Sequence, residues 1–349
     1  MGYRAYTRIK KGVDMKLGLI GAGRIGQLHA ELLTYHVPGA DIKTAAEINL
    51  AEVKEWAQRL NILNITADYT DILNDSEIEA VLICSSTDTH AHMIIAAAKA
   101  GKHIFCEKPI DFNIEKIKQA LNSVEAAGVK LQIGFNRRFD HNFKQVRELV
   151  ESGKVGDVHI VKITSRDPAP PPIEYVKVSG GIFLDMAIHD FDMARYLSVS
   201  EVEEVYAQGA VLIDPAIGQV GDVDTAIITL KFKNGAMGVI DNSRQAVYGY
   251  DQRVEVFGSQ GNVAVQNDFP DSAELSTAQG VFSAKPQYFF LERYKMSYVE
   301  ELKAFVDAVA NDSEPAVTGN DGLQPVLIGM AALKSLAEKR PVKIEEILK

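Results

Sequence analysis

Residues 16–26, KLGLIGAGRIG, decide the fold of the first part of this 349-residue chain. The short apolar run ends in a G-x-G-x-x-G pattern, and apolar residues then recur with helical spacing as far as Leu33. In such a unit the first glycine permits a tight turn, the second lets the backbone approach a pyrophosphate, and the third lets the helix pack against the strand. The unpaired N–H groups and partial positive charge at the helix N-terminus then stabilise the bound phosphates. We therefore predict a dinucleotide site at Gly21, Gly23, Arg24 and Ile25.

Strands and helices alternate from this motif to residue 133. Ala80–Cys84 is an unbroken apolar run, which is typical of a parallel strand covered on both faces. Alternation of this kind indicates βαβ units and a doubly wound parallel sheet, so we predict an α/β Rossmann domain over residues 15–135. Further strands are expected at 16–20, 41–47, 103–106 and 130–133, and helices from residue 25 onward, at 89–100 and at 113–127.

Glu47 ends the second predicted strand, 47 − 21 = 26 residues after the first glycine. The usual gap is about 20 residues. A carboxylate at this point accepts hydrogen bonds from the adenosine ribose and repels a 2′-phosphate. No arginine follows in Ile48–Leu50, so the sequence favours NAD over NADP; the competing interpretation is a solvent-exposed glutamate.

The pattern changes beyond Gly134, where predicted strands cluster and helices become few. We predict a C-terminal α+β domain over residues 136–349, with a large, mostly antiparallel open sheet, whose last helix is free to pack back on the first domain. Asn234-Gly235 is a strong hairpin signal between two of its strands. Strands are expected at 158–166, 202–210, 225–232, 236–244, 252–258 and 262–265, and helices at 140–151, 183–197, 298–309 and 322–339.

Two segments carry residues suited to chemistry. Lys108 stands between Glu107 and Pro109 at the end of a strand, where open α/β sheets bind ligands. After the paired glycines at 180–181, Asp185 and His189 are spaced i, i+4 and would share one face of a helix, an arrangement that orients a general base. The plainer interpretation is a helix start with a packed histidine, and a metal site is ranked low.

Composition excludes several classes of function. The net charge is −10, which argues against a nucleic-acid or anionic-membrane partner. The sequence contains no long uncharged apolar run, so we predict no membrane-spanning helix. The two cysteines, Cys84 and Cys106, end apolar strands, and such sparse usage fits a reducing cytoplasm. Residues 1–14 contain four basic residues and no apolar stretch, so they are interpreted as an extension ahead of the fold.

Together these motifs resemble the Gfo/Idh/MocA oxidoreductases. The resemblance rests on the glycine motif, on Glu107-Lys108-Pro109, and on the paired glycines followed by Asp185 and His189, all in the family's order. It runs from about Met15 to the C-terminus. It implies a Rossmann domain, an α/β domain whose open sheet serves oligomer contacts, and a homotetramer.

The resemblance also implies roles for particular residues. Catalytic roles fall on Lys108, Asp185 and His189, with no metal. Contacts on the nicotinamide side fall on Ser85, Ser86, Thr87, His90, Glu107 and Lys108. Substrate contacts fall on Asn136, Arg137, Asp167, Tyr248 and Tyr250, in addition to the catalytic residues.

A finer resemblance is to the inositol 2-dehydrogenases, and it is carried by Ser165–Pro172, the segment Asp185–Arg195 and Tyr248–Arg253. It implies NAD-dependent oxidation of a ring hydroxyl of myo-inositol, or of scyllo-inositol, to 2-keto-myo-inositol. Asn136 departs from the methionine of many relatives, which leaves the preferred isomer open. Three alternatives remain: a dehydrogenase of another sugar or cyclitol, an NAD-retaining glycosidase, and a nucleotide-binding regulator without catalysis.

Overall fold

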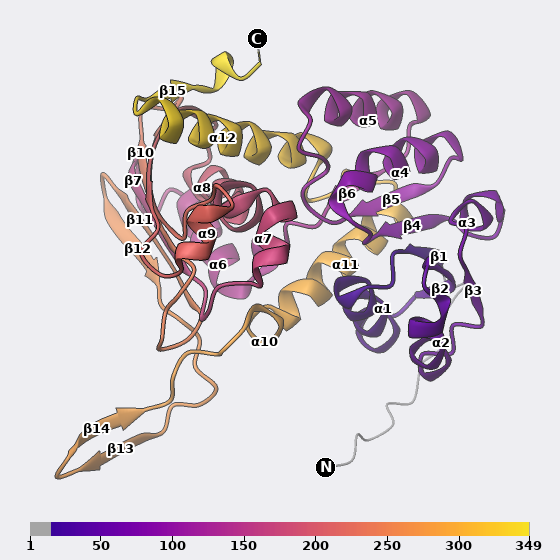
Figure 1. Ribbon diagram of the computed structural model, residues 1–349, viewed down its shortest axis with the longest axis horizontal. Coiled ribbons are helices and arrows are strands. Elements are labelled where there is room, and N and C mark those ends of the chain that lie inside the picture. Colours follow the sequence, from indigo (N-terminus) through magenta and orange to yellow (C-terminus); the bar gives the residue numbers. More distant parts are fainter. Residues whose placement is uncertain (1–14, 349) are drawn as a thin grey trace. The chain divides into compact units, whose positions relative to one another are not determined.

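The computed structural model describes residues 15–348, which form two compact units (Figure 1). The first unit runs to Asn136 and also contains the returning segment Tyr298–Leu323. The second unit contains Arg137–Ser297 and the chain from Gln324 onward. The predicted extension at 1–14 lies outside the described residues. Among the helices of residues 15–348, none is both long and apolar enough to cross a lipid bilayer.

The first unit is built on a six-stranded parallel sheet with the order β3-β2-β1-β4-β5-β6. The central strands are buried on both faces, which confirms the predicted doubly wound sheet. Its strands are β1 (Met15–Ile20), β2 (Ala40–Ala46), β3 (Asn64–Thr66), β4 (Ala80–Ile83), β5 (His103–Cys106) and β6 (Leu131–Ile133). Its helices are α1 (Arg24–His36), α2 (Leu50–Arg59), α3 (Thr70–Asn74), α4 (Thr87–Lys99), α5 (Ile114–Ala127) and most of α11 (Lys295–Ala310).

Four adjacent strands of this sheet, β2, β1, β4 and β5, carry the predicted cofactor residues. Because the strands are parallel, their carboxyl ends meet at one edge of the sheet. The loops that follow them contain Glu47, the glycine motif, Ser85 and Lys108. The topology therefore gathers segments that are far apart in the sequence.

The second unit is built on a seven-stranded sheet with the order β12-β11-β7-β10-β9-β8-β15. Only β10 and β7 pair in parallel, so the prediction of a mostly antiparallel sheet is confirmed. Its strands are β7 (Val158–Arg166), β8 (Val202–Ala210), β9 (Thr225–Phe232), β10 (Met237–Ser243), β11 (Asp251–Gly258), β12 (Gly261–Val265) and β15 (Val342–Lys343). A separate hairpin consists of β13 (Glu274–Thr277) and β14 (Gly280–Ser283).

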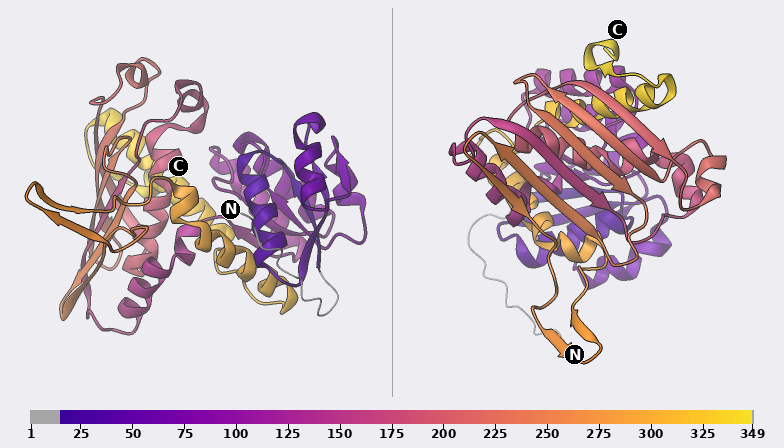
Figure 2. Two further views of the ribbon diagram at one scale, coloured as in Figure 1. Left: turned by 90° about the horizontal axis from the view of Figure 1, so that it is seen from below. Right: turned by 90° about the vertical axis from the view of Figure 1, so that its left-hand side faces the viewer.

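Helices cover one face of this sheet and leave the other open, as the right-hand view of Figure 2 shows. Along β9 buried and exposed residues alternate, which is the pattern of a sheet packed on one face only. Helices α6 and α8 pack against the covered face. The helices of this unit are α6 (His141–Glu151), α7 (Ile173–Ser179), α8 (Ile188–Ser198), α9 (Pro215–Gln219), α10 (Phe290–Arg293) and α12 (Gly319–Glu338, from Gln324), with the short turns η1 (Asn136–Phe139), η2 (Ile182–Met186) and η3 (Ile344–Glu346).

The single helix predicted at 183–197 was wrong, because the chain forms a π-turn, η2, before α8 begins. Gly181 has a φ of 72°, and the N–H of Ile182 donates to the carboxylate of Asp222 at 3.1 Å. The N–H of Ala187 then donates to the carbonyl of Ile182, an i→i+5 bond. Asp185 and His189 therefore do not follow one regular helical spacing. Such π-turns are frequent at functional sites.

Candidate active site

The glycine motif forms the turn between β1 and α1. Gly21 has a φ of 91°, and a Cβ there would lie 2.5 Å from the backbone nitrogen of Ser85. A Cβ on Gly26 would lie 2.0 Å from the carbonyl oxygen of Gly21, so this glycine permits close packing of helix and strand. Gly23 is exposed, and no heavy atom lies within 4 Å of its Cβ position. The turn is thus closed by its first and third glycines and open to a phosphate at the second.

Glu47 braces this turn from the end of β2. Its Oε2 accepts from the N–H of Ala22 at 2.9 Å, and its Oε1 accepts from the N–H of Asn49 at 3.3 Å. The residue is half-buried. Glu47 fixes the backbone next to Gly23.

The loop after β4 is joined to the turn after β5 by one histidine. Nδ1 of His90 lies 2.8 Å from the carbonyl oxygen of Pro109, and Nε2 lies 2.9 Å from that of Ser85. The hydroxyl of Ser85 is hydrogen-bonded to that of Thr89 at 2.7 Å. Ser86 is the N-cap of α4, and Thr87 is its first residue. His90 is buried and holds the two loops in a fixed relation.

The Lys108 turn is organised by the carboxylate of Glu107. Its Oε2 accepts from the N–H of Lys108 at 3.2 Å, and its Oε1 lies 2.7 Å from Nε2 of His29. The peptide bond between Lys108 and Pro109 is cis. A Cβ on Gly134 would lie 3.2 Å from the Glu107 carboxyl carbon, so a glycine leaves room for that carboxylate.

In the second unit, buried polar groups meet on Asp190. Its Oδ1 accepts from Nη1 of Arg137 at 2.6 Å, and its Oδ2 accepts from Nδ2 of Asn242 at 2.8 Å. Nη2 of Arg137 donates to the hydroxyl of Tyr250 at 3.3 Å. Burial raises the pKa of Asp190, although Arg137 opposes the shift, and burial raises the pKa of Tyr250 well above its ordinary value. Tyr250 therefore keeps its proton at neutral pH.

A second cluster surrounds the guanidinium of Arg244, which is almost fully buried. Its nitrogens lie 3.3 Å from Asp185, 4.0 Å from Asp167 and 3.9 Å from Asp222. The hydroxyl of Tyr175 donates to Asp185 at 2.8 Å. Burial raises the pKa of Asp167 to about 6, Arg244 opposes the shift, and the charge of Asp185 adds to it.

The remaining predicted residues have different surroundings. His189 lies half-buried in the first turn of α8. Tyr248 is exposed, and its hydroxyl is hydrogen-bonded to Arg166 and to Asp251. Asn136 ends the first unit, and its buried Nδ2 has no hydrogen-bond partner among the described residues.

Three residues of these clusters were missed in the sequence, namely Asp190, Asn242 and Arg244. Each is charged or polar and almost fully buried. Asn242 and Arg244 continue the inward-facing series of Gly238 and Ile240 on and just after β10, a series that is buried throughout. Polar residues at positions that the strand period assigns to the core indicate a functional site. The alternation along this strand was therefore a sequence signal for Asn242 and Arg244.

A Rossmann sheet with a glycine turn and an acidic residue after its second strand, joined in one chain to a sheet with a buried polar cluster, defines a nucleotide-dependent oxidoreductase. Two family models match: "Oxidoreductase family, NAD-binding Rossmann fold" over residues 15–135, and "GFO/IDH/MocA C-terminal domain" over residues 143–264. The chain belongs to the Gfo/Idh/MocA family of oxidoreductases.

Individual relatives agree over nearly the whole chain. An uncharacterized oxidoreductase of Bacillus subtilis, YrbE, is 55% identical over 94% of this chain and 96% of its own length. The myo-inositol 2-dehydrogenase of Thermotoga maritima is 51% identical over 96% of this chain and 100% of its own length. The scyllo-inositol dehydrogenase of Lactobacillus casei, solved with NAD(H) and scyllo-inositol, superposes with a TM-score of 0.89 at 29% identity, covering 95% of this chain and 99% of that one.

Proposed function

We propose that this protein is an NAD-dependent inositol dehydrogenase. It oxidises a ring hydroxyl of myo-inositol, or of scyllo-inositol, to 2-keto-myo-inositol. The long match to the myo-inositol 2-dehydrogenase of Thermotoga maritima supports this substrate class. Of the two isomers, we favour myo-inositol.

The observation that carries the proposal is the density of buried polar groups in the second unit. Arg137 and Arg244 are donors held in place by carboxylates, and the hydroxyl of Tyr250 is fixed by the hydrogen bond it accepts from Arg137. Asp167 and Asp185 are acceptors within reach of Arg244. A polyol offers a donor and an acceptor at every carbon, so such a surface matches it. A site of this kind rejects molecules without the hydroxyls, because its own buried groups would be left unpaired.

The catalytic roles fall on three residues. His189 takes the proton of the reacting hydroxyl as general base. Lys108 donates a hydrogen bond to the reacting oxygen and stabilises its developing negative charge. Asp185 orients His189 or binds a neighbouring hydroxyl. Bound NAD supplies the acceptor for the hydride that leaves the same carbon.

The first unit fits this cofactor. Gly23 is open to a pyrophosphate, and the start of α1 at Arg24 and Ile25 lies beside it. Glu47 has a carboxylate for the ribose hydroxyls that would repel a 2′-phosphate. The nicotinamide side is assigned to Ser85, Ser86, Thr87, His90, Glu107 and Lys108.

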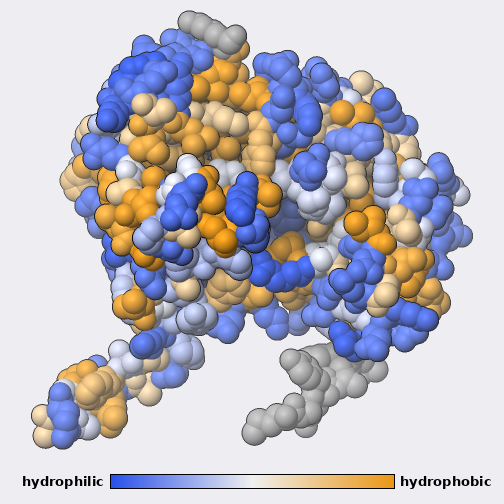
Figure 3. Space-filling view, viewed as in Figure 1, coloured by the Kyte–Doolittle hydropathy of each residue, from blue (hydrophilic) through white to orange (hydrophobic). Residues whose placement is uncertain are grey.

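We assign cofactor binding to residues 15–135, and substrate binding and oligomer contacts to the segment that begins at 136. A homotetramer is supported by the open face of the second sheet, where Ile227, Met237 and Phe257 are exposed. The β13–β14 hairpin adds Leu275 and Phe282, an exposed cross-strand pair on an arm that is partly hydrophobic in Figure 3. Exposed apolar groups of this extent are typical of contact surfaces. The thiols of Cys84 and Cys106 are unpaired, which supports a cytoplasmic location.

The experiment is a steady-state assay of NADH release with separate myo-inositol and scyllo-inositol, each with NAD and then with NADP. The proposal expects turnover with a cyclitol and NAD, and much weaker turnover with NADP. The ratio of the two rates with NAD assigns the isomer. Binding of NAD without turnover of either cyclitol would contradict the proposal.

A further inference from the structure

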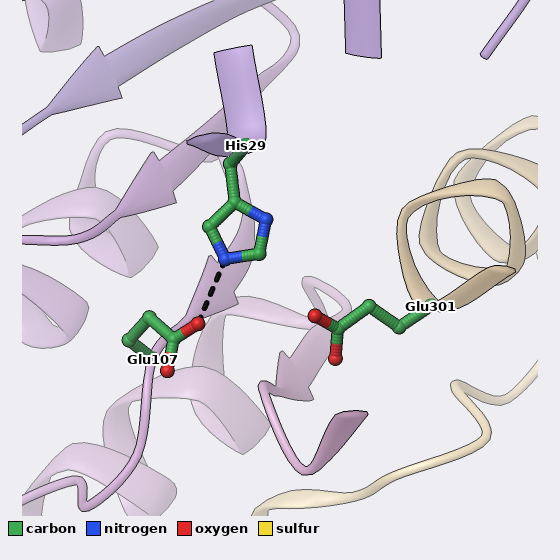
Figure 4. Close-up of side chains that lie close together, drawn as sticks. All are labelled: His29, Glu107 and Glu301. Carbon is green, nitrogen blue, oxygen red and sulfur yellow. Dashed lines mark hydrogen bonds and ion pairs between the residues drawn. The ribbon is translucent and has the colours of Figure 1, made fainter. Parts of the chain in front are cut away.

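Three ionisable side chains meet inside the first unit (Figure 4), and one of them, Glu107, accepts from the N–H of Lys108. His29 comes from α1, Glu107 follows β5, and Glu301 comes from α11. One ring nitrogen of His29 and one carboxylate oxygen from each glutamate all lie within 4.8 Å of one another. The side chain of His29 is fully buried, Glu301 is fully buried, and Glu107 is 13% exposed.

The carboxylate of Glu301 has no hydrogen-bond partner on either oxygen among the described residues, and neither has Nδ1 of His29. In Figure 4 the Glu301 side chain extends toward the other two residues, and Nδ1 is on the side of the ring that faces it. The main chain of Glu301 is fixed, because its carbonyl accepts from Nε2 of Gln132 at 2.8 Å. The rings of Phe105 and Tyr298 pack edge-on against His29. A charged carboxylate is strongly disfavoured in such surroundings.

The positions of the protons follow once Glu107 is ionised and His29 is neutral. An ionised carboxylate only accepts hydrogen bonds, so His29 donates to Glu107 from Nε2. In a neutral imidazole Nδ1 then carries a lone pair and needs a donor. A neutral Glu301 has one O–H that can be donated to this lone pair, directly after a rotation of the side chain or through one water.

We propose that Glu301 is a positioning residue for the Lys108 turn, held as a neutral carboxylic acid so that Glu107 alone carries the charge that fixes His29 and the N–H of Lys108. The effect on catalysis rests on the proposed role of Lys108. The protonation of Glu301 does not rest on it.

The surroundings agree with this assignment. Burial raises the pKa of Glu301 well above its usual range, and the charge of Glu107 adds to the shift. The titratable groups around the cluster are His29 on α1, Tyr298 on α11, Cys84 after β4, and Cys106 and Glu107 at the end of β5. Burial also raises the pKa of both thiols well above the usual value, so they add no charge.

A bound divalent cation is the rival way to neutralise two buried carboxylates beside an imidazole, because these are ordinary metal ligands. It would need both carboxylates ionised. The two explanations therefore predict opposite results when Glu301 is replaced by its neutral isostere.

The test is Glu301→Gln, compared with Glu300→Gln, a change at an exposed neighbour on the same helix. Urea unfolding is measured from pH 5 to pH 8 without cofactor. A group whose pKa is raised by folding stabilises the fold fully below its unfolded pKa and loses that contribution as pH rises. The unfolding constant of the wild type, divided by that of Glu301→Gln, should therefore rise up to tenfold per pH unit above about pH 5. The Glu300→Gln variant should follow the wild type.

Parallel pH curves for Glu301→Gln and the wild type would overturn the proposal, as would one equivalent of metal in the purified protein. The positioning role is tested by turnover. We expect Glu301→Ala to lower kcat about tenfold or more, and Glu301→Gln to restore it to within about twofold. Equal damage in both variants would overturn the role, and if Glu301→Ala does not fold, the glutamine variant decides. If no cyclitol is oxidised at all, the proposed function fails while the unfolding result still stands.

Discussion

Lys108 is the residue on which the proposed chemistry most depends, because it is the only group assigned to the developing charge on the substrate oxygen. Replacing Lys108 with alanine should lower kcat by roughly 10²–10³-fold, the usual loss for one oxyanion donor. The free energy of unfolding should change little. Steady-state kinetics and urea unfolding measure the two quantities.

Lys116→Ala is the matched control, since Lys116 is a more exposed lysine of the same unit. It should leave kcat unchanged. Normal turnover in Lys108→Ala would remove this residue from the mechanism.

We expect the ionised carboxylate of Asp167 to lower the free energy of unfolding and to contribute to substrate binding. Its pKa is about 6 in the folded chain, against about 3.9 in an unfolded one. A raised carboxyl pKa means that its contribution to stability is complete below about pH 4 and is lost as pH rises through 6. Asp167→Asn should therefore be more stable at pH 7, by about 3 kcal/mol, and should bind inositol more weakly.

Urea unfolding at pH 4 and pH 7, with KM for inositol, measures both effects. The exposed Asp157→Asn is the control and should alter neither. A gain in stability that is the same at both pH values would contradict the assigned pKa. An unchanged KM would remove Asp167 from the substrate site.

The roles of single residues could be predicted where only one residue type satisfies the steric requirement of the position. Gly21 and Gly26 could be interpreted from the motif, because a Cβ at either position collides with backbone. Glu47 could be placed, but its hydrogen bond to Ala22 could not, since that depends on the register of β2. Arg244 was missed because its three acidic neighbours are distant in the sequence.

At the scale of elements, the turn before η2 depends on Gly181. This glycine has a φ of 72°, and a Cβ would lie 2.7 Å from Oδ1 of Asp222, the acceptor of the Ile182 N–H. Gly181→Ala should destabilise the protein by about 2–3 kcal/mol, from left-handed backbone strain plus the clash. It should also lower kcat, because η2 holds Asp185.

Gly221→Ala is the control, since Gly221 has a φ of 85° but no heavy atom within 4 Å of its Cβ position. It should cost about 1 kcal/mol and leave kcat unchanged. Thermal unfolding and steady-state kinetics give both values. Equal behaviour of the two variants would mean that the contact with Asp222 is unimportant.

The elements themselves were largely predictable from periodicity. Most strands of both sheets lie within one or two residues of their expected ranges, and β9 and β10 are joined at Asn234-Gly235 as expected. The break at η2 was not predictable, because it requires a carboxylate from Asp222, some forty residues away. The β13–β14 hairpin was also missed, since its residues are exposed and lack a core-facing period.

For the whole molecule, the open sheet should form the contacts of the proposed homotetramer. A double change, Met237→Glu with Phe257→Glu, places charges on its exposed face and should lower the mass measured by light scattering. Leu63→Lys, at an even more exposed apolar position of the first unit, should not change it. A wild-type protein that is monomeric at micromolar concentration would contradict the tetramer.

The division of the chain was only partly visible in its sequence. The change of pattern at Gly134 predicts where the first sheet ends. The return of Tyr298–Leu323 to the first unit is a long-range event, made through contacts such as the Gln132 amide on the carbonyl of Glu301. No local pattern encodes such a contact.

The most direct test of the central claim follows the hydride itself. Myo-inositol deuterated at the ring carbon C2 is incubated with the protein and NAD, and the released cofactor and the product are analysed by NMR. The account predicts deuterium at C4 of NADH free in solution, in equal amount to 2-keto-myo-inositol. Unlabelled cofactor with no ketone, from protein that binds NAD, would contradict it.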